Sequence, residues 1–156
     1  MKLAAVTELD RKFIREAYNE AAQGFDQGGV PVGAVMVKNG EVVARGRNKR
    51  VQEGDAVMHG ETDCLRSAGV RSDYEQIHLY TTLSPCMMCT GAILHFNIPR
   101  VVIGENKNFP GNIEFLTDRG VEVVLLDDRE CIDLMSRFIK QRPDIWLEDI
   151  AGNEEV

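Results

Sequence analysis

The order of strand and helix patterns along the chain is the feature that most constrains its fold. Residues 32–37 have the pattern of a buried strand and residues 41–46 that of its partner strand. Asn39-Gly40, a pair typical of a two-residue hairpin turn, lies between them. After this hairpin, helix patterns and strand patterns alternate. Alternation of this kind requires crossover connections, which place helices over a sheet that contains parallel strands. The order therefore predicts an α/β fold in which one mixed sheet is covered by helices on both faces.

Local signals place the individual elements. A capping box at residues 7–10 predicts a first helix that ends near Gly24. Its buried face is expected to carry four residues at a spacing of four: Leu9, Phe13, Ala17 and Ala21. The other helices are expected at residues 59–68, 86–96 and 128–139, and the remaining strands at residues 77–82, 100–104 and 121–126. We also expect a loop with a short helix before residue 121, and a short segment that runs to Asp149.

Length and charge narrow the range of functions. The chain has 156 residues, about the size of one domain, and no internal repeat or linker-like stretch, so we expect a single domain over residues 1–156. Lys and Arg number 18 against 25 Asp and Glu, which gives a formal net charge of -7. This charge is unfavourable for holding a phosphate backbone and suits a small, weakly charged ligand.

The compartment is inferred from the apolar runs. The apolar start of the chain meets Glu8 and Asp10 too early to form the core of a secretory signal peptide. The sequence has no uninterrupted apolar run that approaches the roughly 18 residues of a membrane-spanning helix. We therefore expect a soluble, cytoplasmic protein that does not bind membranes. In that reducing compartment, closely spaced cysteines are expected to be metal ligands or redox groups.

Two short motifs carry the residues that point to chemistry. His59-Gly60-Glu61 lies at the start of an expected helix, and Pro85-Cys86-Met87-Met88-Cys89 lies where a strand gives way to a helix. Cys86 and Cys89 are three positions apart, so both sulfurs lie on one face of the helix. Imidazole and thiolate are ligands that Zn²⁺ prefers. The sequence therefore predicts that His59, Cys86 and Cys89 hold one zinc ion.

The number of ligands indicates what kind of zinc site this is. Three protein ligands leave the fourth tetrahedral position for water, which is the arrangement of a catalytic site. The positive ends of the two expected helices would stabilise the thiolates. Glu61 follows the histidine by two positions and is predicted to act beside the water as the catalytic acid and base.

Other interpretations of these motifs stay open at this point. A Cys-x-x-Cys pair between a strand and a helix also occurs in thioredoxin-like redox proteins, although His59 and Glu61 would then be unexplained. A closed structural zinc site would need a fourth ligand, for which the chain offers Cys64, His78, His95 or Cys131. We expect the two cysteines to be small core residues and the two histidines to be structural or surface residues.

Both motifs, in this order, resemble the signature of zinc nucleobase deaminases. The chain is similar to the cytidine deaminase-like superfamily, and most similar to its small fungal-type cytosine deaminases. The similarity extends over nearly the whole chain. It includes these segments: Gly28-Gly29-Val30-Pro31, Gly46-Arg47-Asn48, Thr81-Thr82-Leu83-Ser84-Pro85-Cys86, Cys89-Thr90-Gly91-Ala92, Gly104-Glu105-Asn106, Asn108-Phe109 and Trp146-x-Glu148-Asp149-Ile150.

The resemblance implies a three-layer α/β/α fold with a central mixed five-stranded sheet, a homodimer, one Zn²⁺ per chain and a free nucleobase as substrate. In such enzymes the residues that match Asn48 and Asp149 hydrogen-bond the pyrimidine edge. Those that match Phe109 and Trp146 close over the ring. Backbone groups around three further residues complete the substrate pocket: Gly60, Leu83 and Ser84. The alternative for Asn48 is a turn residue at the end of a strand, and for Trp146 it is simple core packing.

The reaction implied by the resemblance is hydrolytic deamination of an aminopyrimidine, with cytosine converted to uracil and ammonia. Glu61 would take a proton from the attacking water, pass it to ring nitrogen N3 and then carry a proton to the leaving amine. Three departures from the fungal pattern, at Val32, Met87 and Leu147, leave the ligands unchanged. They put the choice among cytosine, 5-substituted cytosine and isocytosine in question.

Three rival functions remain. A guanine or related purine deaminase would use the same chemistry in a larger pocket. A deaminase of tRNA or other nucleic acid shares the zinc motifs, but the net charge of -7 and the absence of a basic run in the sequence argue against it. The non-enzymatic rival is a structural zinc domain.

Overall fold

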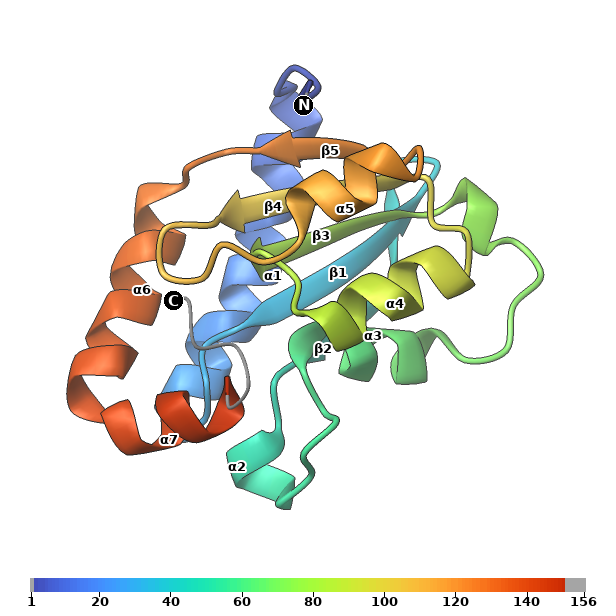
Figure 1. Ribbon diagram of the computed structural model, residues 1–156. Coiled ribbons are helices and arrows are strands. Elements are labelled where there is room, and N and C mark those ends of the chain that lie inside the picture. The colour runs from blue at the N-terminus through green and yellow to red at the C-terminus, as the bar shows by residue number, and fades with distance from the viewer. Residues whose placement is uncertain (1, 151–156) are drawn as a thin grey trace.

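A five-stranded mixed sheet forms the centre of the computed structural model, which describes residues 2–150 (Figure 1). The strands are β1 (Gly33–Lys38), β2 (Glu41–Arg47), β3 (His78–Leu83), β4 (Arg100–Glu105) and β5 (Glu122–Leu125). They lie in the order β2-β1-β3-β4-β5 across the sheet. Strand β1 is antiparallel to β2 and β3, whereas β3, β4 and β5 run parallel to one another. The predicted mixed five-stranded sheet is confirmed.

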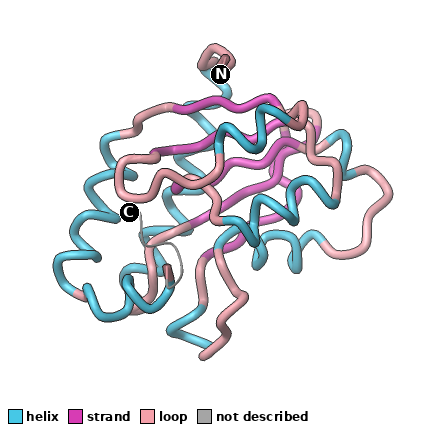
Figure 2. The backbone as a smooth tube through the Cα atoms, in the orientation of Figure 1, coloured by secondary structure: helices cyan, strands magenta, loops and turns pink. Residues whose placement is uncertain are grey.

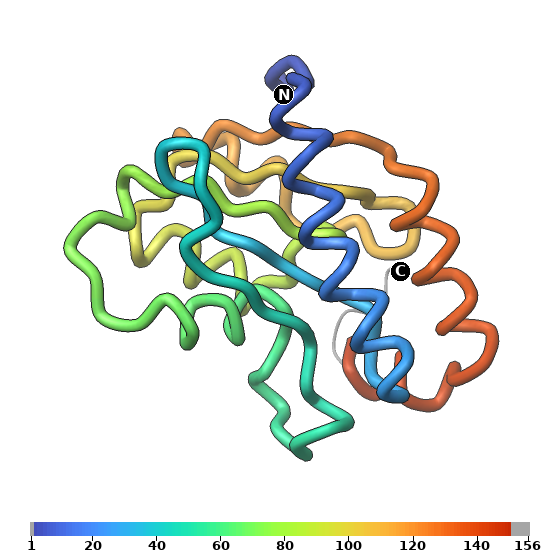
Figure 3. The backbone as a smooth tube through the Cα atoms, turned by 180° about the vertical axis from the view of Figure 1, so that it is seen from behind, coloured from blue at the N-terminus to red at the C-terminus, as the bar shows by residue number. Residues whose placement is uncertain are grey.

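Helices cover both faces of the sheet. One face carries α1 (Glu8–Asp26) and α6 (Arg129–Gln141), and the other carries α3 (Gly60–Ala68), α4 (Met87–His95) and α5 (Ile113–Asp118). Figure 1 looks onto the face with α4 and α5, and Figure 3 shows the opposite face with α1 in front. The short helices α2 (Arg50–Glu53) and α7 (Pro143–Asp149) lie together beyond one edge of the sheet. The three-layer α/β/α arrangement is therefore as expected.

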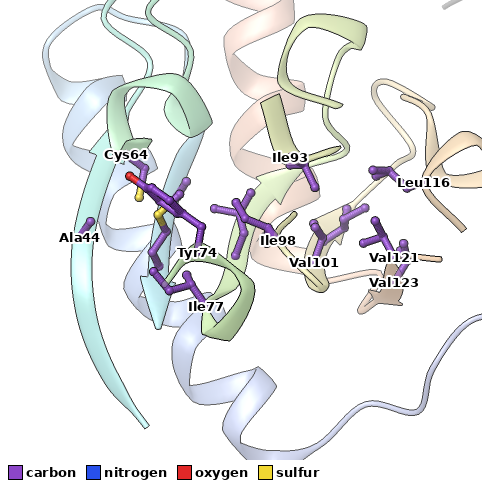
Figure 4. Packing of buried hydrophobic residues seen from close by; sticks show 14 of the residues in the cluster. Ala44, Cys64, Tyr74, Ile77, Ile93, Ile98, Val101, Leu116, Val121 and Val123 are labelled. Atoms are coloured by element: carbon purple, nitrogen blue, oxygen red, sulfur yellow. The ribbon is translucent and has the colours of Figure 1, made fainter. Parts of the chain in front are cut away.

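Alternating strand side chains fill two apolar layers, one on each face of the sheet. The first layer packs strand residues against α3, α4 and α5, and its members include Met36, Leu79, Val101, Cys64, Ile93 and Leu116 (Figure 4). The second packs strand residues against α1 and α6, and its members include Val35, Tyr80, Val102, Phe13 and Cys131. Neighbouring residues of one strand thus enter opposite layers, as the two-residue period of a strand requires.

Helix α1 begins at the expected capping box but buries a different residue from the one predicted. The hydroxyl of Thr7 accepts from the backbone N–H of Asp10 at 3.2 Å, and the Asp10 carboxylate accepts from the N–H of Thr7 at 3.0 Å. Asp10 also binds Arg100 of β4 in a bidentate ion pair, with contacts of 2.7 and 2.9 Å. Asp10 is 1% exposed, whereas Leu9 is 55% exposed. The prediction that Leu9 faces the core is wrong, because the ion pair with Arg100 turns Asp10 inward.

The other expected elements begin and end within two residues of the observed ones. The sequence did not predict α2 or the short 3₁₀ helix at Tyr74–Gln76, and the C-terminal segment proves to be the helix α7. Figure 2 shows how the loops join these elements. Within residues 2–150, the structure has no helix that is both long enough and apolar enough to cross a membrane.

The topology brings several strand ends to one edge of the sheet. The carboxyl ends of β3 and β4 lie side by side there, with Leu83 paired to Glu105, and the antiparallel β1 begins at the same edge. The chain after β2 also returns to it, since the N–H of Asn48 donates to the carbonyl of Val32 at 2.9 Å. In α/β folds, ligand sites form outside the carboxyl ends of parallel strands. The candidate site lies at this edge.

Candidate active site

His59 is held at the beginning of α3. It is the N-cap residue of that helix and has an extended backbone. The hydroxyl of Thr62 accepts from the backbone N–H of His59 at 2.9 Å and donates to the carbonyl of Val57. This reciprocal bonding fixes the first turn of the helix, and with it the backbone from which the imidazole projects.

The two predicted cysteine ligands lie at the beginning of α4. Cys86 is its N-cap residue and Cys89 is the third residue of the helix. The N–H of Thr90 donates to the carbonyl of Cys86 at 2.8 Å, which closes the first turn. Helix N-termini carry partial positive charge, which favours a thiolate at this position. That thiolate is Cys86, because its hydrogen bond with Cys89, together with burial, raises the pKa of the Cys89 thiol.

The three predicted ligands converge. Nδ1 of His59 lies 3.4 Å from Sγ of Cys86 and 3.8 Å from Sγ of Cys89, and the three ligand atoms all lie within 4.8 Å of one another. On the other side of the ring, Nε2 of His59 lies 3.0 Å from Oδ1 of Asp149. The carboxylate is an acceptor only, so Nε2 carries a proton and Nδ1 is the nitrogen that faces the two sulfurs. One imidazole and two sulfurs, with a carboxylate behind the imidazole, fit Zn²⁺.

The electrostatic surroundings favour a thiolate at this cluster. A hydrogen bond from Cys89 lowers the pKa of Cys86 to about 4, against the effect of burial, and His59 adds to the lowering. Burial acts to lower the pKa of His59, but its hydrogen bonds with Asp149 and Cys86 raise that pKa to about 10. A proton therefore competes with a metal ion for Nδ1, so metal binding releases a proton.

Glu61 lies next to this cluster and is 4% exposed. Burial, together with the negative charge of Cys86, raises the pKa of Glu61 to about 7. A carboxyl group whose pKa lies near neutral pH can both accept and donate a proton under physiological conditions. Its place and its chemistry suit the role of acid and base predicted for it.

A pocket of ≈ 40 Å³ opens beside the cluster. Its lining comes from the sheet edge, the starts of α3 and α4, the loop after β4 and the helix α7. The lining residues are Val32, Asn48, His59, Glu61, Leu83, Ser84, Cys86, Phe109, Trp146, Asp149 and Ile150. The structure thus brings together all the predicted site residues except Gly60 and Cys89 as pocket walls. Gly60 packs against Val32 at the start of α3, and Cys89 is the fully buried member of the cluster.

Two aromatic rings form one side of the pocket. Phe109 and Trp146 meet edge to face with ring centroids 6.2 Å apart, and they are 5% and 6% exposed. Asn48 is 2% exposed, and its Oδ1 accepts from the backbone N–H of Arg50 at 2.9 Å. Asn48 is therefore both a turn residue, as its alternative interpretation held, and part of the pocket wall. Because Oδ1 is used by the turn, the amide offers Nδ2 as a donor to the pocket.

Two pocket residues and one supporting contact are not predicted from the sequence. Val32 and Ile150 line the pocket without an expected role in it. Arg50 lies outside the lining: its Nη2 lies 2.9 Å from Oε1 of Glu148, and its Nε lies 3.9 Å from Oδ1 of Asp149. The contact with Glu148 joins α2 to α7 across 98 positions of sequence, and no local pattern indicates it.

The closed zinc site is not supported by the positions of its candidate fourth ligands. Cys64 and Cys131 are buried in the two apolar layers. His78 is half-buried in β3, and His95 is exposed at the end of α4. Within residues 2–150, His59, Cys86 and Cys89 form the one group of three or more potential ligands whose ligand atoms lie close together.

Comparisons with known proteins agree with this geometry. The family model for the cytidine and deoxycytidylate deaminase zinc-binding region matches residues 7–105. A cytosine deaminase of Candida albicans is 46% identical over 145 residues, which cover 91% of this chain and 97% of that protein. A tRNA-specific adenosine deaminase of Streptococcus pyogenes serotype M18 is 32% identical over 141 residues, covering 83% of this chain and 89% of the relative.

Solved structures show the same fold. A chain from a study of tRNA:A34 deaminases aligns with a TM-score of 0.69 and 28% identity, over 80% of this chain and 99% of that one. The matched region contains the His59, Cys86 and Cys89 cluster as well as Glu61. The chain therefore belongs to the family of zinc-binding cytidine and deoxycytidylate deaminases.

Proposed function

We propose that this protein catalyses the hydrolytic deamination of free cytosine to uracil and ammonia. The observation that carries the proposal is the buried Glu61 beside the His59, Cys86 and Cys89 cluster, in a pocket walled by two aromatic rings. The 46% identity with a cytosine deaminase over almost the whole chain supports the same substrate.

Each site residue has a defined part in this reaction. His59, Cys86 and Cys89 would hold Zn²⁺, which would supply Lewis acidity that makes a water molecule nucleophilic near neutral pH. Glu61 would accept one proton from the attacking water and deliver it to ring nitrogen N3. It would then take the proton of the hydroxyl group added at C4 and give it to the amine, which leaves as ammonia when the C4–N bond breaks. Asp149 keeps the imidazole of His59 in the orientation that directs Nδ1 to the sulfurs.

The part of the pocket wall that α7 supplies favours a free base over larger substrates. Trp146 and Asp149 of α7 are both lining residues. We propose that this wall leaves no room for a ribose or an RNA strand attached to the base. We therefore propose a small-molecule nucleobase as partner and no nucleic acid, in line with the formal net charge of -7.

The hydrogen-bond donor of Asn48 gives a second criterion for which base the pocket accepts. Its Nδ2 matches a ring carbonyl two positions from the carbon that carries the amine. Cytosine, isocytosine and guanine have such a carbonyl, whereas adenine has a C–H group there. A site that offers a buried donor disfavours a substrate that leaves the donor unpaired. The donor thus argues against adenine and is compatible with cytosine, isocytosine and guanine.

We further propose that residues 1–156 form one domain, that the protein is a cytoplasmic homodimer and that it acts in pyrimidine salvage. The exposed side chains of Met87, Met88 and Phe96, on and next to α4, are apolar surface that a second copy would cover. The thiols of Cys86 and Cys89 need a reducing compartment to remain metal ligands. Analytical ultracentrifugation would measure the dimer, and a monomer at micromolar concentration would contradict it.

The test of function is ammonia release from a panel of free bases and a nucleoside, measured on zinc-loaded protein. The panel holds cytosine, 5-methylcytosine, isocytosine, guanine, adenine and cytidine, and cytosine should give the highest kcat/KM. Glu61→Gln should reduce kcat by about 10²–10⁴-fold, the usual contribution of a general acid and base, with zinc content unchanged. Glu114→Gln, at an exposed position on α5, is the matched control and should behave as wild type.

Three results would contradict the proposal. Release from cytidine but not from cytosine would contradict the free-base assignment. Near-normal turnover by Glu61→Gln would contradict the role of the carboxyl group. Bound zinc with no ammonia released from any aminated base would favour a structural zinc domain.

A further inference from the structure

Glu105 is a fully buried carboxyl group that takes no part in the proposed reaction. It is the last residue of β4 and is 0% exposed. Burial raises the pKa of Glu105, although hydrogen bonds from Asn108 and Lys107 act in the opposite direction. A charged group in such a place is costly unless several donors satisfy it. The donors that satisfy Glu105 come from the loop after β4.

The carboxylate of Glu105 fixes the loop that follows β4 through three hydrogen bonds. Its Oε2 accepts from the backbone N–H groups of Lys107 at 2.7 Å and of Asn108 at 2.9 Å, and its Oε1 accepts from Nδ2 of Asn108 at 2.9 Å. Three donors that converge on one site require a group with acceptors only, which an ionised carboxylate is. Phe109, the aromatic wall of the pocket, is the next residue after Asn108.

Asn108 extends this contact to α6. Its Nδ2 also donates to the carbonyl of Ile132 at 3.1 Å, and its Oδ1 accepts from the hydroxyl of Ser136 at 3.2 Å. Figure 1 shows the loop after β4 running toward α6 before it returns to α5, and Figure 3 shows the same proximity from behind. Helix α7, which carries Trp146, follows α6 directly. Asn108 therefore connects the loop of Phe109 to the segment that leads to Trp146.

The far end of the loop is fastened to the segment that leads to Cys86. The hydroxyl of Ser84 donates to the carbonyl of Pro110 at 2.9 Å. Gly111 has a φ of +64°, and a Cβ at that position would lie 2.1 Å from the Ser84 hydroxyl, so only glycine fits there. The carbonyl of Glu105 itself accepts from the N–H of Ser84 at 2.9 Å. Phe109 thus lies between Asn108, which is bonded to Glu105, and Pro110, which is bonded to Ser84.

We propose that Glu105 is the positioning residue that sets the Phe109 ring against the base. The inference rests on the proposed function, because it assigns a cause to the position of one wall of that pocket. Glu105 acts through the backbone at Lys107 and Asn108 and touches no substrate. Its loss should loosen the packing of the base more than it changes the chemical step.

The test compares Glu105→Gln with a control of similar chemistry. The amide keeps the shape of the side chain and one acceptor oxygen, but it cannot accept from all three donors. KM for cytosine should rise by about 10-fold, roughly the effect of one lost hydrogen bond to a charged group, while kcat changes by less than about 3-fold and zinc content stays the same. Asn108→Ala should give a similar rise in KM. Asp10→Asn, which alters the buried carboxylate on α1 that binds Arg100, should leave KM unchanged even where it lowers the melting temperature.

Trp146 provides a measurement that needs no activity. The sequence has a single tryptophan, and it contacts Phe109 edge to face. Glu105→Gln should therefore raise the quenching of its fluorescence by acrylamide, and it should speed hydrogen exchange at the amides of Lys107 and Asn108.

The outcomes separate this inference from the proposed function. If Glu105→Gln lowers the melting temperature as Asp10→Asn does, yet leaves KM, quenching and exchange at wild-type values, Glu105 is only structural and the inference is wrong. If the wild-type protein does not deaminate cytosine, the proposed function fails, and fluorescence and exchange still decide whether Glu105 holds the loop.

Discussion

Replacing Asp149 by Asn is expected to weaken the affinity of the protein for Zn²⁺ by about 10-fold. Oδ1 of Asp149 lies 3.0 Å from Nε2 of His59, and its side chain is 6% exposed, so little water screens the contact. Groups that orient a metal-binding histidine contribute about 10- to 100-fold to metal affinity. An asparagine keeps an acceptor oxygen in this place but loses the charge, and a charge-assisted hydrogen bond is roughly twice as strong as a neutral one. The loss should therefore lie near the lower end of the range, about 1.4 kcal/mol.

Competition with a chromogenic chelator at pH 7 measures this affinity directly and requires no substrate. Asp149→Ala removes the acceptor altogether and should lie near the 100-fold end of the range. Glu148→Gln is the matched control, since it makes the same chemical change at the next position of α7. The Glu148 side chain is 73% exposed and pairs with Arg50, away from His59, so its zinc affinity should equal that of wild type.

An Asp149→Asn protein that binds zinc within about twofold of wild type would refute this reasoning. So would an equal loss in Glu148→Gln, because that would assign the effect to α7 as a whole and not to the carboxylate behind His59. A far-ultraviolet circular dichroism spectrum of each variant shows whether the fold is retained.

The two remaining predictions concern the ion pair of α1 and the identity of the ligands. Asp10→Asn should lower the free energy of unfolding at pH 7 by about 3 kcal/mol in urea titrations, the low end for a broken buried pair because Glu122 still binds Arg100. Burial would raise the pKa of Asp10, but Arg100 holds that pKa below its usual value. The stability from this ion pair is therefore present above about pH 4 and is lost as the pH falls through the folded-state pKa. A difference between wild type and variant that stays constant down to pH 2 would contradict this assignment. Cys86→Ala should reduce zinc content well below one ion per chain by metal analysis, whereas Cys64→Ala should leave it unchanged, and an equal loss in both would revive the closed zinc site.

Most of the fold could be predicted because its signals are local. The Asn39-Gly40 turn, the capping box at Thr7 and the alternation of periods each act over a few residues, and they placed the elements within two residues of their observed ends. Leu9 shows the limit of such signals. A stripe at a spacing of four placed it in the core, but the partner that draws Asp10 inward is Arg100, 90 positions away. No local pattern contains that partner.

The site divides in the same way. His59 and Cys86 are N-cap residues, and Glu61 and Cys89 lie in the first turns that follow, so a short motif contains both the residue types and the geometry of the cluster. The residues that hold this cluster act between elements. Asp149 reaches His59 across 90 positions, and Arg50 reaches Glu148 across 98. No local sequence pattern indicates that these distant residues are in contact.

The boundary of the family match divides the pocket wall. The matched residues, 7–105, contain the metal cluster, Glu61 and Asn48, and they end at Glu105. The two aromatic residues of the pocket wall, Phe109 and Trp146, follow that boundary. The groups that would contact a base therefore come partly from the matched region and partly from the segments after β4. Glu105 contacts both parts of the site. Its carbonyl accepts a hydrogen bond from Ser84, in the segment that leads to Cys86, and its carboxylate accepts one from Asn108, in the loop that carries Phe109. A change at this residue should thus alter how well a base is held while the metal cluster stays intact.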